Sequence, residues 1–230
     1  MKKTINQLFA FVALALATLT SCNSTSNDNP SVESFLTFAT LTASNEMGST
    51  FTAQEDGDSP VVTFTSTVEL NTKVYALGDR YIINYSNDSK ERFKSGPIDL
   101  YGVYGIGNGK AEVKSQDDIA KLRRDPIDIT SAARTGKYIN LVCNAALSSK
   151  ARNINLYFDE ATADDEYPVA YVGFESDNAA SSPKTFYASI DVSTVWNKQS
   201  CKGITLNFEN NGMVKNVKFE KSGMDITPAE

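Results

Sequence analysis

The chain has 230 residues, with 22 lysines and arginines against 28 aspartates and glutamates, and it contains no histidine. This acidic balance argues against nucleic acid as a partner. Without histidine the chain cannot build a Ser-His-Asp or Cys-His site, a histidine zinc site or the commonest general base. The composition therefore favours a binding or structural protein, and we expect no enzymatic activity, no cofactor and no metal.

The N-terminal segment has the organisation of a secretory signal peptide. Two lysines at positions 2 and 3 precede an apolar stretch from about Leu8 to Leu19, and small residues follow. The apolar stretch is too short to span a bilayer, which takes about 20 residues. The sequence "LTSC", which ends at Cys22, resembles the bacterial lipobox. That resemblance implies cleavage after residue 21 and lipidation of Cys22; an ordinary signal with an incidental cysteine is the alternative.

A lipidated Cys22 would anchor the mature chain to a membrane, because two or more acyl chains hold stably in a bilayer. Residues 22–34 are then the acylated cysteine and a polar tether. Removing Lys2 and Lys3 with the signal takes two positive charges from a net charge of −6 and leaves −8. The first six residues after Cys22, 23–28, carry a single acid, Asp28, so the periplasmic and the surface-exposed face both stay open.

The rest of the chain is predicted to be mainly β. Short segments rich in Val, Ile, Tyr, Phe and Thr alternate apolar and polar residues, as in "INLYFDE" and "ITLNFEN", and turn signals separate them. This spacing is typical of a sandwich or a barrel. The predicted strands are Phe35–Ala43, Val61–Thr67, Tyr81–Tyr85, Ile98–Tyr104, Tyr138–Cys143, Ile154–Asp159, Val169–Glu175, Thr185–Val192, Ile204–Glu209 and Val214–Phe219.

One short helix is predicted within "SQDDIAKLRRDP". Ser115 can cap its start, acids follow in the first turn, basic residues fall in the expected last turn, and Pro126 ends it. We place the boundary between two β-rich halves at this helix. The expected organisation is residues 1–21 as signal, 22–34 as tether, 35–114 as a barrel domain and 115–230 as a sandwich domain.

Several features together resemble the NigD-like lipoproteins of Bacteroidetes. These are the lipobox, "ALGDRYIINYS" in the first half, the helix running into "DPI", and "GKYINLVCN" with "NINLYFDE" in the second half. The resemblance implies a small OB-like β-barrel followed by an immunoglobulin-like β-sandwich, with one short helix between them, at the outer membrane. It supplies no catalytic residues, and only Cys22 transfers with a defined role.

Two other motifs invite a chemical interpretation. "GVYGIGNGKAE" fails the phosphate-loop pattern, because Tyr104 and Ala111 occupy positions that need Gly and Ser or Thr, so we expect a glycine-bearing strand that leads into a turn at Asn108-Gly109. "DEATADDEY" clusters carboxylates between two predicted strands. We interpret it as a solvated loop; Ca²⁺ coordination or carboxylate catalysis are the alternatives.

The remaining candidate sites are cysteines and aromatic residues. With Cys22 lipidated, Cys143 and Cys201 form an even pair, which is either a disulfide or two buried free thiols. Trp196, Tyr157 and Tyr101 are candidates for a ligand platform, because aromatic faces beside amides and acids can hold sugars or peptides; ordinary aromatic packing is the alternative.

Three functions follow from these observations. The favoured one is a non-catalytic binding module of the cell envelope that recognises a protein or a glycan. The second is a structural or immunity-type accessory subunit of an envelope complex. The least favoured is a carboxylate-dependent glycosidase.

Overall fold

The computed structural model describes residues 33–122, 124–146, 153–175, 183–210 and 213–221. These residues form two compact units. Of the described residues, the first contains 33–53 and 61–105, and the second contains those of 54–60 and 106–221. Among the described residues no helix is long and apolar enough to cross a membrane. Every predicted strand is present, so the expected mainly β fold, a barrel followed by a sandwich, is confirmed.

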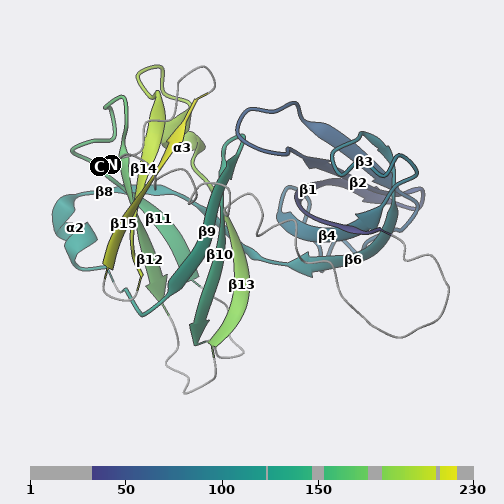
Figure 1. The fold of residues 1–230 in the computed structure, drawn as a ribbon, viewed down its shortest axis with the longest axis horizontal. Coiled ribbons are helices and arrows are strands. Elements are labelled where there is room, and N and C mark those ends of the chain that lie inside the picture. The colour runs from purple at the N-terminus through teal and green to yellow at the C-terminus, as the bar shows by residue number, and fades with distance from the viewer. Residues whose placement is uncertain (1–32, 123, 147–152, 176–182, 211–212, 222–230) are drawn as a thin grey trace, which may run out of the picture. The chain divides into compact units, whose positions relative to one another are not determined.

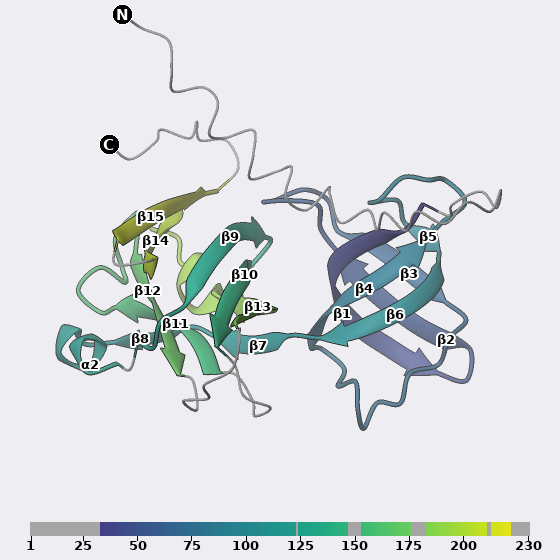
Figure 2. The same ribbon diagram turned by 60° about the horizontal axis from the view of Figure 1, so that its bottom comes forward.

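The first unit is one six-stranded sheet in the order β5-β3-β2-β1-β4-β6. Its two ends meet, because the short β5 pairs parallel with β3, β6 pairs with β4, and only Ile98 separates β5 from β6. The sheet therefore closes on itself, as Figures 1 and 2 show, in the manner of an OB-like barrel. The strands are β1 (Phe35–Asn45), β2 (Gly48–Ala53), β3 (Val62–Ser66), β4 (Arg80–Ser86), β5 (Gly96–Pro97) and β6 (Asp99–Gly105).

The barrel core follows from alternation along the strands. Leu41, Phe51, Phe64, Ile83 and Tyr85 have no exposed surface, and all belong to one apolar cluster. The outer face of β1, β2 and β3 carries cross-strand threonine pairs instead. Such cross-strand pairs stabilise a sheet.

The second unit is a sandwich of two sheets, which Figure 1 shows as two layers. One sheet has the order β7-β13-β10-β9 and the other the order β15-β14-β12-β11-β8. Three of its strand pairs are parallel, β13 with β7, β11 with β8 and β12 with β14. The strands are β7 (Gly107–Lys110), β8 (Glu112–Lys114), β9 (Asp128–Thr135), β10 (Tyr138–Ala146), β11 (Asn153–Asp159), β12 (Val169–Glu175), β13 (Pro183–Asp191), β14 (Gly203–Asn210) and β15 (Met213–Glu220).

The units divide between Gly105 and Ile106 rather than after Lys114. The reason is that β7 and β8, which precede the predicted boundary, complete the two sheets of the sandwich. The glycine-rich segment is also a strand at positions 107–110, not a turn at Asn108-Gly109. A Cβ at Gly109 would lie 3.1 Å from the Asn155 side chain and 3.2 Å from that of Ile190, so the glycine permits close strand packing.

The predicted helix is present but shorter than expected. Helix α2 (Gln116–Ala120) begins after Ser115, whose hydroxyl accepts a hydrogen bond from the Asp118 backbone N–H and donates one to the Asp118 carboxylate. It ends before the basic residues predicted for its last turn. Arg124 instead bridges to Phe174 near the end of β12, so this segment pairs with β12 rather than continuing the helix. A second helix, α3 (Ser193–Trp196), was not predicted.

Candidate functional site

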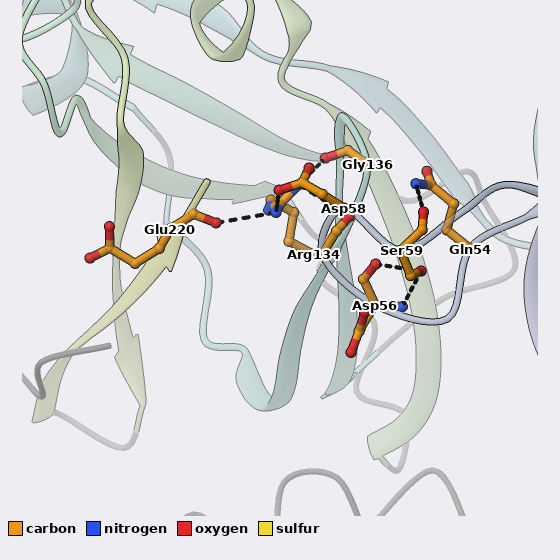
Figure 3. A network of polar contacts seen from close by, with 8 residues as sticks. Gln54, Asp56, Asp58, Ser59, Arg134, Gly136 and Glu220 are labelled. Carbon is orange, nitrogen blue, oxygen red and sulfur yellow. Dashed lines mark hydrogen bonds and ion pairs between the residues drawn. The ribbon is translucent and has the colours of Figure 1, made fainter. Parts of the chain in front are cut away.

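The most elaborate polar cluster of the second unit surrounds Arg134 at the end of β9, where the side chain is only 4% exposed (Figure 3). Its guanidinium forms a two-pronged ion pair with Asp58, over nitrogen–oxygen distances of 2.9 and 2.8 Å. It also donates to the backbone carbonyls of Gly57, Gly136 and Glu220, at 3.2, 2.7 and 3.1 Å. A fork of five N–H donors is suited to this arrangement, and lysine could not reproduce it.

Residues 54–60 supply Asp58 to this cluster. Ser59 organises the loop: its hydroxyl accepts from the backbone N–H groups of Glu55 and Asp56 and donates to the Asp56 carbonyl. Gln54 donates to the Ser59 carbonyl at 2.7 Å. Gly57 also bridges to Thr135 beside β9. The loop is therefore fixed by its own hydrogen bonds and by pairing with the sandwich.

Trp196 is not the exposed platform that the sequence suggested. It ends α3 with 7% of its surface exposed, within the sandwich core. The Arg134 guanidinium carbon lies 4.2 Å from its ring centroid and the Lys221 ammonium lies 5.2 Å from it. These cation–π contacts make Trp196 part of the Arg134 cluster, which we call the arginine cluster (Asp58, Arg134, Trp196 and the three carbonyls).

The two tyrosines lie in different units. Tyr101 on β6 is 52% exposed, and its hydroxyl lies 2.7 Å from that of Ser86. Tyr157 on β11 is half-buried: its ring covers Gly173, where a Cβ would lie 2.5 Å from the ring, and the Lys114 ammonium lies 5.0 Å from its centroid. Packing of Tyr157 against a glycine in the neighbouring strand stabilises the sheet.

Cys143 and Cys201 are both buried and both free thiols in the structure. Burial, with the nearby Asp128 charge, raises the pKa of Cys143 to about 12. Burial also raises the pKa of Cys201, whose Sγ lies 3.3 Å from the Gly203 carbonyl oxygen. Thiols with raised pKa values are poor nucleophiles and poor metal ligands at neutral pH. The lipidation candidate, Cys22, lies outside the described residues.

The acidic segment after β11 is tied down by internal contacts. Asp159 is buried and accepts from Gln116 at 2.8 Å and from the Ala161 backbone N–H at 2.9 Å. Asp164 pairs with Lys198 at 2.7 Å, and Glu166 pairs with Lys202. Over the described parts of the chain, no group of three Cys, Asp or Glu side chains is arranged to hold a metal ion.

Sequence reasoning missed Asp58 and Arg134. Strand β9, which carries Arg134, has a short and weakly apolar pattern and was not predicted. One signal was available: Arg134 alternates onto the same face as Ala132, and both pair with buried residues of β10, Ile139 and Leu141. An arginine on the core side of a strand needs a carboxylate partner. Nothing in the local sequence identifies which acid supplies it.

No family model matches the chain, and no curated protein matches it. Solved structures do resemble it. A protein of unknown function, DUF1344, from Bacteroides vulgatus has a TM-score of 0.65 at 14% identity, over 86% of this chain and 96% of that one. A candidate lipoprotein from Bacteroides fragilis has a TM-score of 0.59 at 11% identity, over 84% and 100%.

A third structure connects the fold to the resemblance noted in the sequence. A NigD-like immunity protein from Bacteroides caccae has a TM-score of 0.55 at 14% identity, over 83% of this chain and 94% of that one. At these identities the likeness concerns the fold. The chain therefore has the two-domain β fold that these Bacteroides proteins, a NigD-like immunity protein among them, share.

Proposed function

We propose that the protein is a lipid-anchored, non-catalytic binding module of the cell envelope. The lipobox-like sequence at Cys22 supports the anchor, and the likeness in fold to a candidate lipoprotein is consistent with it. The outer membrane is the expected location, with the periplasmic and the surface face both open. We propose a protein partner ahead of a glycan, because Trp196 is buried in the sandwich core and Tyr157 packs against Gly173.

The observation that carries this proposal is how the charged groups of the sandwich are used. The arginine cluster places its donors on backbone carbonyls and on Asp58, all within the protein. Asp164 pairs with Lys198, and Asp159 accepts a hydrogen bond from the Ala161 backbone N–H, in the same way. Charged groups whose partners lie within the protein stabilise its fold and keep the scaffold rigid. Rigid β scaffolds typically carry their function on exposed loops.

An immunity-type accessory role is the second candidate. One similar structure is a NigD-like immunity protein, and another, from Parabacteroides distasonis, is described as toxin related, with a TM-score of 0.60 at 14% identity over 83% of this chain and 95% of that one. An immunity protein acts by binding, so this candidate is a special case of the first. A carboxylate-dependent glycosidase has less support, because Asp164 and Glu166 pair with lysines and Asp159 is buried.

The anchor and the binding role need separate experiments. Growth with a radiolabelled fatty acid should label the protein and leave a Cys22→Ser variant unlabelled and released from membranes; label on the variant would refute the anchor. Protease treatment of intact cells decides which face of the membrane the protein occupies, since a protected protein must face the periplasm.

A photo-crosslinker placed at exposed positions over both units should capture one protein repeatedly. Capture of no protein from any position would refute the binding role.

A further inference from the structure

The barrel presents exposed apolar side chains at one end. The turn between β1 and β2 holds Met47, which is 90% exposed, and the loop after β3, residues 67–79, holds Val68, Val74 and Leu77, which are 43%, 68% and 54% exposed. Both segments lie at the same end, because Ser49 at the start of β2 pairs with Ser66 at the end of β3. We call these two segments the barrel tip (residues 45–48 and 67–79).

The barrel tip is fixed in shape. The Ser44 hydroxyl donates to the Leu70 carbonyl and accepts from its N–H, and the Ser49 hydroxyl donates to the Val68 carbonyl. Gly78 donates to the Leu41 carbonyl at 2.8 Å, which anchors the far end of the loop. Leu70 and Tyr75 pack onto the barrel core. The apolar side chains that remain outside are therefore displayed by an ordered loop, which reduces the entropy lost when a partner binds.

Charge around the barrel tip has one dominant sign. Glu46, Glu69 and Asp79 are exposed in these two segments, and the exposed basic residue there is Lys73. An apolar centre with an acidic rim suits a partner that surrounds an apolar side chain with lysine or arginine. The same acids repel the anionic headgroups of a membrane surface.

The tip lies at the end of the barrel opposite to the start of β1. The chain enters the barrel at Phe35, which pairs with Tyr85, and β1 then runs for 11 residues to Asn45 at the tip. That length corresponds to about 35 Å. Phe35, the residue at which the expected tether joins β1, therefore lies at the end of the barrel opposite the tip. We propose that the barrel tip is the docking surface for a protein partner whose binding segment combines an apolar side chain with basic residues. This inference rests on the proposed binding function and names its surface and partner chemistry.

The test uses the chain from Asn23 to Glu230, which keeps every residue that the structure describes. A displayed library of random peptides is selected on this protein and then measured against Leu77→Asp, with Met213→Asp as the matched control, since Met213 is 60% exposed on β15 of the other unit. Selected peptides should combine apolar with Lys or Arg residues. Their affinity should fall about tenfold or more with Leu77→Asp and less than about twofold with Met213→Asp. Raising the salt concentration should weaken them.

Other occupants of the tip give different results. Peptides that are acidic, or that bind Leu77→Asp unchanged, overturn the proposal, as does a selection that enriches nothing. Sedimentation with phosphatidylglycerol vesicles that depends on Leu77 would assign the tip to lipid, and self-association that depends on Leu77 would assign it to a second copy. Crosslinking in the producing cells distinguishes the proposed binding function from the proposed docking surface. Capture of a partner from Met213 but not from Leu77 would refute the barrel tip as the docking surface and leave the binding function standing.

Discussion

Replacing Arg134 with methionine tests whether the arginine cluster holds the second unit together. Methionine keeps much of the volume and removes the charge and all five donors. Three backbone carbonyls and Asp58 then lose their partner. Removing one member of a buried ion pair costs about 3–5 kcal/mol. Because Asp58 is 34% exposed and can be rehydrated, we expect a loss of about 2–4 kcal/mol in the free energy of unfolding.

The assay is denaturant unfolding followed by tryptophan fluorescence. Trp196 is the one tryptophan in the sequence and lies 4.2 Å from Arg134, so the signal reports the unfolding of the second unit separately from the barrel. The matched control is Lys137→Met, which breaks an ion pair with Asp191 whose lysine is 47% exposed and should cost less than about 1 kcal/mol. Where Arg134→Met does not fold, Arg134→Lys replaces it, since a point charge cannot reproduce the fork.

A double-mutant cycle with Asp58→Asn completes the test. If the two side chains act as one unit, the effects of Arg134→Met and Asp58→Asn should fail to add, with a coupling of about 1–2 kcal/mol. Additive effects, or an unfolding midpoint for Arg134→Met that matches the parent protein, would refute the reasoning. In that case the loop 54–60 would be held by its own hydrogen bonds and by the pairing of Gly57 with Thr135.

Three further predictions concern other parts of the fold. A thiol reagent should leave Cys143 and Cys201 of the native protein unlabelled at pH 8, because both are buried with raised pKa values, and should label both after unfolding without reductant; failure to label then would show a disulfide. Gly48→Ala should destabilise the barrel by about 2–4 kcal/mol, because φ is +122° and the new Cβ would lie 1.8 Å from the Ser66 carbonyl oxygen. Gly78→Ala, at φ +88° with open space, should cost only about 1 kcal/mol by thermal unfolding, and equal losses would contradict this argument. The pKa of Asp191 is lowered: burial raises it, but hydrogen bonds from Lys137 and Ser193 outweigh burial, so its stabilising contribution should be present at neutral pH and vanish as the pH falls below about 4. Lys137→Met should flatten that part of the stability curve, and an unchanged pH profile would show that the pair contributes nothing.

Local patterns predicted the strands and the helix start because their causes are local. Ile154, Leu156 and Phe158 alternate along β11, and all three are buried in the sandwich core. Ser115 caps α2 by accepting a hydrogen bond from the Asp118 backbone N–H, three residues further along the chain. In both cases the residues that produce the local structure lie within a few positions of one another, so the sequence alone predicts it. The end of α2 was predicted less well, because pairing of Arg124 with β12 competes with continuation of the helix.

The pairing of distant segments was beyond the reach of local patterns. Strand β7 looked like a turn because its glycines are typical of turns, yet tertiary packing against Ile190 and Asn155 makes it a strand. Trp196 looked like an exposed aromatic residue because the sequence does not show that a buried arginine lies against its ring. Arg134 and Asp58 are 76 residues apart, and either could have paired with another charge.

The sequence by itself determined the β character of the chain, which residues of a strand share its buried face, and the lipobox-like start. These depend on the spacing of side chains over a few residues, or on a short motif. The tertiary structure alone decided how the barrel closes, which strands complete the sandwich, and which acid neutralises Arg134. Those choices depend on the free energy of burying whole faces together, and that energy is summed over segments that meet only when the chain has folded.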